Sequence, residues 1–73
     1  TSYQMNFLKA VVDGVHSGFT SSDVLARYSL GAKSNVARIQ KALIERELVE
    51  KRGKLIFASD PVFSVWFKRE YSR

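Results

Sequence analysis

Residues 34–46 carry apolar and polar side chains at the spacing of a helix that buries one face and exposes the other. Val36, Ile39 and Leu43 are three and four positions apart, which places them on one side of a helix. The polar side chains at the remaining positions are those of Ser34, Asn35, Arg38, Lys41 and Glu45. We expect Ser34 to cap this helix, because a serine hydroxyl can accept a hydrogen bond from a backbone N–H of the first turn. The apolar side must be covered by the rest of the chain, and the polar side is left for a partner.

Two further helices are predicted before this stretch. Apolar side chains at helical spacing indicate a first helix over residues 2–16. They are Tyr3, Phe7, Leu8, Val11, Val12 and Val15. A short second helix is predicted over residues 21–28, with Thr20 as its cap, and Ser29-Leu30-Gly31 supplies the turn that follows. A short helix, a turn containing glycine and a longer helix are typical of a helix-turn-helix.

A basic hairpin is predicted directly after the long helix. Residues 48–52 and 55–59 have the pattern of two strands, and Gly53 between them can adopt the positive φ of a tight turn. Lys51, Arg52 and Lys54 lie near its tip. Such cations can neutralise phosphates of a nucleic acid. Alternatively, they keep an exposed strand edge from pairing with other chains.

Asp60-Pro61 predicts the start of a last helix over residues 61–71. Proline fits the first helical position and forces the preceding aspartate into the extended conformation of a capping residue. The large apolar side chains of this helix are Val62, Phe63, Val65, Trp66, Phe67 and Tyr71. They cover more than one face, so we expect part of the helix to pack on helix 2–16 and part to form an exposed patch. Phe63 and Phe67 are assigned to the core, whereas Trp66, with Tyr71, is a candidate for docking a partner.

The length of the chain limits it to one domain, residues 1–73, with one hydrophobic core. Because it has no cysteine, neither disulfides nor thiolate metal sites can stabilise it, and an intracellular, cytoplasmic setting fits best. No apolar run is long enough to cross a membrane. The chain begins with Thr1 rather than methionine, from which we expect a part excised from a larger protein.

The formal net charge of +5 is unevenly distributed. Residues 1–32 contain two positive and two negative side chains, and residues 59–73 have a net charge of +1. Residues 33–58 contain seven positive side chains against three glutamates, a net charge of +4. The basic excess therefore coincides with the long helix and the hairpin, which is the pattern of a moderate nucleic-acid footprint.

The predicted order is helix, helix, turn, helix, hairpin and helix. This is the order of a winged helix-turn-helix, in which the hairpin is the wing. We therefore predict a mostly helical α+β fold, with a three-helix core, a β-hairpin wing and a C-terminal helix. The helix at residues 34–46 takes the place of the recognition helix.

Several stretches carry a more specific likeness. They are Phe19-Thr20-Ser21, Tyr28-Ser29-Leu30-Gly31, residues 34–39, residues 43–49 and residues 60–67. Together they resemble the region after the nucleotide-binding domain in prokaryotic AAA-type ATPases of the STAND group, particularly in Bacteroidetes-like sequences. Asp60-Pro61-Val62-Phe63, followed three residues later by Trp66, is the most distinctive piece.

The resemblance implies a regulatory or docking module in the C-terminal part of an ATPase whose ATP-binding module comes earlier. The four glycines of this chain nowhere form the phosphate-binding pattern G-x-x-x-x-G-K-[ST], so nucleotide binding would belong to sequence outside it. We therefore expect this chain to be no enzyme and to bind no cofactor.

The candidate DNA-contacting residues lie on and around the long helix and the hairpin. They are Lys33, Ser34, Asn35, Arg38, Lys41, Lys51, Arg52 and Lys54. Asparagine can bond bidentately to adenine and arginine to guanine, each good pair discriminating by about 1–3 kcal/mol, while serine and lysine can reach phosphates. The alternative is a polar helix face that contacts protein, such as the ATPase domain of the same chain, or solvent.

Catalysis and metal binding have little support in the sequence. His16 is the only histidine, and no cysteine accompanies it, so we expect it to end helix 2–16, where a cation favours the helix dipole. Glu45, Glu47 and Glu50 span a helix end and a strand. They are therefore predicted to be surface charges rather than an acid/base pair.

Overall fold

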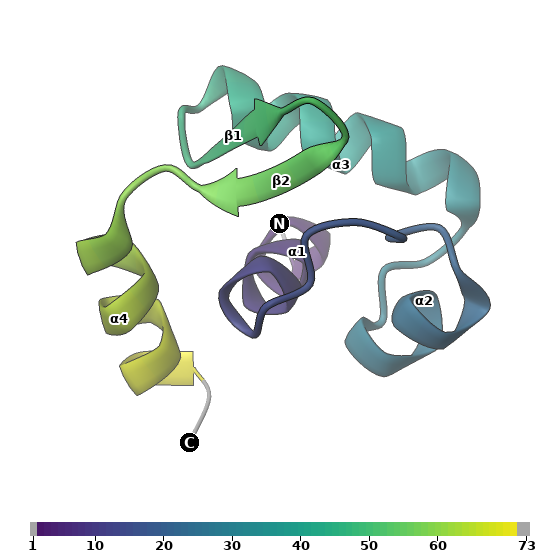
Figure 1. The fold of residues 1–73 in the computed structure, drawn as a ribbon. Helices are drawn as coiled ribbons and strands as arrows, with labels where there is room; N and C mark the ends of the chain where they lie inside the picture. The colour runs from purple at the N-terminus through teal and green to yellow at the C-terminus, as the bar shows by residue number, and fades with distance from the viewer. Residues whose placement is uncertain (1, 72–73) are drawn as a thin grey trace.

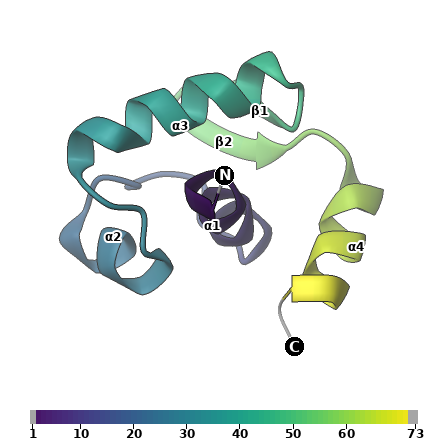
Figure 2. The same cartoon turned by 180° about the vertical axis from the view of Figure 1, so that it is seen from behind.

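The computed structural model describes the backbone of residues 2–71 and, within that range, every side chain except those at positions 61, 63, 64, 68 and 71. The elements follow in the order α1 (Ser2–Val12), α2 (Ser22–Tyr28), α3 (Lys33–Glu45), β1 (Val49–Arg52), β2 (Leu55–Ala58) and α4 (Pro61–Tyr71). Helix α1 lies at the centre, α3 and the hairpin cover one side of it, and α2 and α4 flank it on opposite sides of the molecule (Figure 1). The view from behind shows the same arrangement (Figure 2). The predicted α+β winged-helix architecture is thus confirmed.

The wing is an antiparallel pair of strands, β1 and β2, whose register runs from Val49 opposite Ala58 to Arg52 opposite Leu55. Gly53 and Lys54 form the turn, and Gly53 has a φ of 61°, as predicted from the need for a tight turn. Each strand is one residue shorter than predicted at the end away from the turn. There, the backbone N–H of Ser59 still donates to the carbonyl of Leu48 at 3.2 Å.

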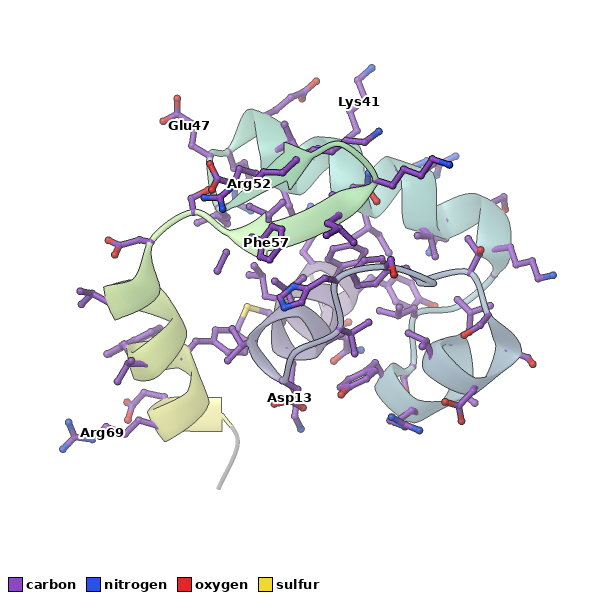
Figure 3. The ribbon with its side chains drawn as sticks, in the orientation of Figure 1. Asp13, Lys41, Glu47, Arg52, Phe57 and Arg69 are labelled. Atoms are coloured by element: carbon purple, nitrogen blue, oxygen red, sulfur yellow. The ribbon has the colours of Figure 1, made fainter. Side chains whose placement is uncertain are left out.

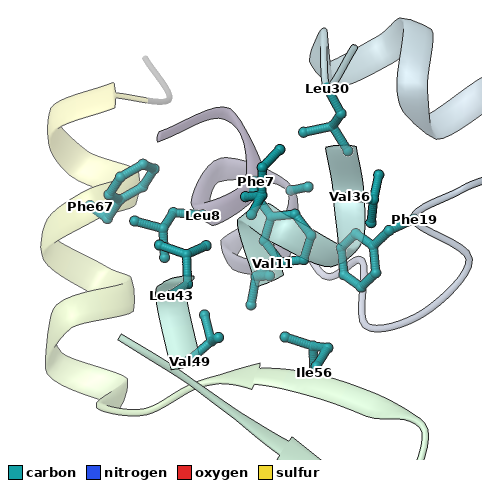
Figure 4. Packing of buried hydrophobic residues seen from close by; sticks show 12 residues of the cluster. Phe7, Leu8, Val11, Phe19, Leu30, Val36, Leu43, Val49, Ile56 and Phe67 are labelled. Atoms are coloured by element: carbon teal, nitrogen blue, oxygen red, sulfur yellow. The ribbon is translucent and has the colours of Figure 1, made fainter. Parts of the chain in front are cut away.

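One apolar core joins all the elements except α2, which contributes partly buried side chains (Figure 4). Among the described side chains, the buried ones are those of Phe7, Leu8, Ala10, Val11, Phe19, Leu30, Val36, Ile39, Leu43, Val49, Ile56 and Phe67. The rings of Phe7 and Phe19 stack with centroids 4.4 Å apart. Phe67 is buried as predicted, whereas Tyr3, assigned to the apolar stripe of the first helix, is 45% exposed because the first turn of α1 extends past the core.

Helix α1 ends at Val12, not at residue 16 as predicted. Gly14 has a φ of 107°, the N–H of Gly14 donates to the carbonyl of Val11, and the N–H of Val15 donates to the carbonyl of Ala10. These bonds form a Schellman motif, in which a residue at positive φ closes the helix and satisfies its last carbonyls. Glycine takes that conformation at little cost. The apolar periodicity continues past the helix because Val15 still packs on the core.

The N-terminal caps of two helices differ from those predicted. Helix α2 is capped by Ser21, whose hydroxyl accepts from the N–H of Val24 at 3.2 Å, and not by Thr20. Helix α3 begins at Lys33, one residue earlier than predicted, with Ala32 at its cap and no side-chain cap bond. Ser34 therefore lies within the first turn, where its hydroxyl is exposed and free to contact a partner.

The cap of α4 is as predicted, because Asp60 Oδ1 accepts from the N–H of Val62 at 2.9 Å. At the other end of α3, Glu47 has a φ of 60°. Its N–H donates to the carbonyl of Ile44, and the N–H of Leu48 donates to the carbonyl of Leu43. This is again a Schellman motif, but with a glutamate at the position where glycine is favoured.

His16 does not end α1, so its predicted role at the helix dipole is wrong. It lies in the α1–α2 connection against β2, where its carbonyl accepts from the N–H of Ile56 at 2.8 Å. Its Nδ1 is 2.8 Å from the carbonyl oxygen of Ile56 and donates to it, since a carbonyl can only accept. The imidazole also stacks on Phe57, with centroids 4.4 Å apart. His16 thus holds the connection against the wing.

Candidate nucleic-acid interface

Helix α3 presents a polar face to solvent. Val36, Ile39 and Leu43 are buried in the core, which turns the opposite side outward. The exposed residues of that side are Lys33, Ser34, Ala37, Arg38, Lys41 and Glu45. This set, the outer face of α3, contains four of the predicted DNA-contacting residues.

Charge changes sign along α3. Lys33, Arg38 and Lys41 occupy the N-terminal and middle turns, whereas the end of the helix and the two residues after it, Glu45, Arg46 and Glu47, have a net charge of −1. Within the described part of the chain, the three cations form no ion pair. Lys33 even opposes the helix dipole, a penalty of about 0.3–1 kcal/mol, so its presence there does not serve the stability of the helix. The basic half of α3 is free to meet an anion.

Asn35 lies at the edge of this face and is only partly exposed. A Cβ placed on Gly31 would lie 3.3 Å from its Nδ2 and 3.3 Å from the ring of Tyr3. The amide therefore sits between the α2–α3 turn and the start of α1. Asn35 and Arg38 line a hollow of about 210 Å³ with Tyr3, Gln4, Ile39 and Ala42.

The two faces of the wing separate its three predicted contact residues. Lys51 lies opposite Ile56, on the face that is directed toward the core and α3. Arg52 points to the other face, where it forms an ion pair with Glu50 and its guanidinium carbon is 5.1 Å from the centroid of Phe57 (Figure 3). Lys54 lies in the turn, with Lys51. The structure therefore brings Lys51 and Lys54 together and directs Arg52 away from them.

Lys51 and Lys54 line a groove of about 270 Å³ between the wing, α3 and the α1–α2 connection. We call it the wing groove. Its other lining residues are Ser17, Gly18, Phe19, Thr20, Val36, Gln40 and Ile56. The polar members Ser17, Thr20 and Gln40 were not among the predicted site residues. Only the long-range packing of the α1–α2 connection against the wing brings them together.

The candidate docking residues lie on α4, well away from the outer face of α3 (Figure 3). Trp66 is 50% exposed, beside Val62 at 74% and Val65 at 69%. The predicted apolar patch thus exists, and among the described side chains of α4 it contains these three residues. The side chains of Tyr71 and Phe63 fall outside those that the structure describes.

No metal-binding group of three or more histidine, cysteine, aspartate or glutamate side chains occurs among the described residues. None of the described helices is both long and apolar enough to span a membrane. Of the described titratable groups, Tyr28 is the one whose pKa departs clearly from its ordinary value. Burial raises its pKa above 10.0, and the carboxylate of Asp13, which accepts from the Tyr28 hydroxyl at 3.1 Å, raises the pKa further. Tyr28 lies between α1 and α2, away from the wing.

Comparison with known protein families agrees with this geometry. No curated protein and no solved structure matches the chain. The family described as a probable winged helix domain matches residues 1–69, which include α1, α2, α3, both strands of the wing and all but the last two residues of α4. The chain is therefore a member of the probable winged helix domain family.

Proposed function

We propose that this winged helix domain binds duplex DNA, with α3 in the major groove and the wing against the phosphate backbone. The main support is the exposure of Arg38 and Lys41 on the outer face of α3 without an ion pair among the described residues. The major groove admits a helix, and arginine is the commonest side chain to read guanine there. Lys33 and Ser34 would contact phosphates from the first turn, and Asn35 would approach a base from the edge of the same face.

The parent of the domain is part of the proposal. The resemblance of residues 19–21, 28–31, 34–39, 43–49 and 60–67 to the region after the nucleotide-binding domain of STAND-type ATPases supports a regulatory module in the C-terminal part of such an enzyme. ATP would then be bound and hydrolysed by the preceding module, and this chain would itself catalyse nothing. A DNA-binding module of a prokaryotic ATPase would work in the cytoplasm.

The proposal is tested by titrating the 73-residue chain into a labelled duplex of random sequence at several salt concentrations. Non-specific binding of this kind has a Kd of about 10⁻⁴ to 10⁻⁶ M at physiological salt, and it tightens as salt is removed. If about four phosphates are neutralised, the slope of log K against log salt is about −3.6. Absence of binding at low salt would overturn the proposal.

The role of Arg38 is tested with a pool of duplexes of randomised sequence. We expect the wild-type chain to enrich particular sequences and Arg38→Ala to lose about 10- to 100-fold of that preference, since a bidentate contact to guanine would be removed. Arg69→Ala is the matched control, because Arg69 is an exposed arginine on α4, far from Lys41 (Figure 3). Equal preference in the Arg38→Ala and wild-type chains would remove Arg38 from the interface.

A second candidate function is protein docking through α4, favoured by the exposure of Val62 and Val65. Here the ATPase part of the parent protein, or another subunit, would cover Val62, Val65 and Trp66, with Tyr71 nearby in the sequence. In the intact parent protein, Val65→Lys should then weaken the association of the domain with the ATPase part and leave duplex binding unchanged. Unchanged association would exclude this surface as the docking site.

A further inference from the structure

The wing groove differs in charge from the rest of the hairpin. Two of its lining residues, Lys51 and Lys54, are cations, and no carboxylate of the described part of the chain lines it. On the opposite face of the wing, Arg52 is paired with Glu50 and covers Phe57, so its charge is already partly compensated. Uncompensated positive charge is therefore directed toward α3 rather than along the outside of the wing.

Neutral hydrogen-bond donors face the two lysines from other elements. Ser17 and Thr20, whose side chains carry hydroxyls, line the groove from the α1–α2 connection, and Gln40, whose side chain carries an amide, lines it from α3. Hydroxyl and amide groups are the usual partners of phosphate oxygens beside lysine. The floor of the groove is apolar and consists of Phe19, Val36 and Ile56, all of which are buried. One side of the groove is thus cationic, the opposite side is neutral and polar, and the floor consists of buried apolar side chains.

The α1–α2 connection is held in place at both ends of the segment that forms the wall. His16 is bonded to Ile56 through its carbonyl and through Nδ1, each at 2.8 Å. Phe19 is buried and stacks on Phe7. Ser17 and Thr20 therefore have a fixed backbone position before any ligand arrives, which lowers the entropic cost of binding.

The wing groove adjoins the outer face of α3. Gln40 lies three residues after Ala37, and Lys41 lies four residues after it, so Ala37 separates the groove from the basic turns of α3. Ala37 is exposed and has the smallest side chain of that face, which leaves room for a ligand to pass from one region to the other. A polyanion on the outer face of α3 would reach the groove without a barrier.

We propose that the wing groove holds one strand of the DNA backbone, with Lys51 and Lys54 neutralising its phosphates and Ser17, Thr20 and Gln40 donating hydrogen bonds to them. The inference rests on the proposed DNA binding and assigns contacts to three residues that the sequence did not indicate. It also excludes Arg52, although Arg52 is a neighbouring exposed cation of the same hairpin. The groove is open to solvent along its length rather than enclosed, as a strand that passes through it requires.

The inference is tested by comparing variants on the two faces of the wing, with a labelled duplex of random sequence as the probe. Lys51→Gln and Lys54→Gln should each make the salt slope less steep by about 0.9, because each removes one phosphate contact. The control is the double variant Glu50→Gln/Arg52→Gln, which removes the ion pair of the outer face and leaves the net charge unchanged. We expect its slope to equal that of the wild-type chain. A loss of slope as large as that of Lys51→Gln would overturn the inference.

The neutral polar residues of the groove, Ser17, Thr20 and Gln40, form its neutral wall. Their contribution is tested with Thr20→Val and Gln40→Leu. Each should weaken duplex binding by about two- to tenfold through the loss of a hydrogen bond, with the salt slope unchanged because no charge is removed. The midpoint of urea unfolding, measured for each variant, establishes that the fold persists. Lys51→Arg should keep the wild-type slope. Wild-type affinity in both wall variants would remove the α1–α2 connection and Gln40 from the interface.

These outcomes separate the inference from the proposed function. If the wild-type chain does not bind duplex DNA at low salt, the proposed function itself fails. If it binds, and binding depends on Arg38 while the groove variants match the Glu50→Gln/Arg52→Gln control, the function stands and the wing groove is not where the backbone lies.

Discussion

At the scale of single residues, His16 takes the place of a neighbouring strand beside β2, through its backbone carbonyl and its side chain. Its carbonyl accepts from the N–H of Ile56, as a neighbouring strand would, and its Nδ1 donates to the carbonyl of the same residue. Both backbone groups of Ile56 that face away from β1 are thereby satisfied. At this point His16 therefore covers the exposed edge of β2, with which no third strand pairs in the described part of the chain.

Replacing His16 by alanine should lower the free energy of unfolding by about 1–2 kcal/mol, because it removes the bond from Nδ1 and the stacking on Phe57. His16→Phe keeps an aromatic ring against Phe57 and loses only the bond, so its loss should be smaller. Urea unfolding of the three chains measures both effects. Equal stability of wild type and His16→Ala would show that the contact does not hold the connection.

Tyr28 gives the stability of the domain a dependence on alkaline pH. Burial, and then the carboxylate of Asp13, raises its pKa above the ordinary value of 10.0, so the folded state favours the protonated hydroxyl more than the unfolded state does. Its contribution is therefore complete below about pH 10 and is lost as the pH rises through the pKa of the folded state. The stability difference between wild type and Tyr28→Phe should be constant from about pH 7 to 9 and shrink toward pH 11. A difference that does not change with pH would contradict this assignment.

At the scale of elements, the helices are ended by residues in the left-handed conformation. Gly14, Ser29 and Glu47 occupy this position after α1, α2 and α3, with φ values of 107°, 53° and 60°. Apolar periodicity alone does not reveal these endings, because Val15 and Leu48 continue to pack on the core after the helical bonds have stopped. This is why the first helix was predicted too long.

Glu47→Gly should raise the free energy of unfolding by about 1 kcal/mol, since glycine takes a φ of 60° without the steric penalty of a side chain. Arg46→Gly is the matched control. Arg46 has a φ of −84°, so glycine there relieves no strain, adds freedom to the unfolded chain and removes the bond from Arg46 Nη1 to Gln4 Oε1, and it should therefore destabilise. Chemical denaturation of both variants tests the opposite signs. Destabilisation by Glu47→Gly would contradict the strain assigned to this position.

At the scale of the whole molecule, a single small core supports two separate surfaces. Helix α3 and the wing lie on one side of α1, and α4 lies at one flank of the molecule (Figure 1). A duplex and a protein partner could therefore be bound at the same time. The two functions considered above do not compete for space.

Phe7→Ala tests whether the stability of the whole domain depends on its single core. Phe7 is fully buried and stacks on Phe19, so its truncation should cost about 3–5 kcal/mol. A domain of 73 residues has a total stability of about 4–11 kcal/mol, so this loss removes much or all of it. Thermal unfolding followed by circular dichroism should show a greatly lowered or absent transition. Met5→Ala, on the exposed side of the same helix, should cost less than about 1 kcal/mol, and equal losses in the two variants would contradict the assignment of the core.

The sequence by itself determined the order of the elements and the inward face of α3, because apolar spacing, Gly53 and Asp60-Pro61 act locally along the chain. It also identified Arg38 and Lys41 as outward cations, since a helix that buries Val36, Ile39 and Leu43 on one side exposes the positions on the opposite side. Only the tertiary structure decided which basic residues of the wing lie together. Lys51 and Arg52 are adjacent in sequence, yet the pleat directs them to opposite faces, and the distant connection at residues 17–20 completes a groove on one face alone.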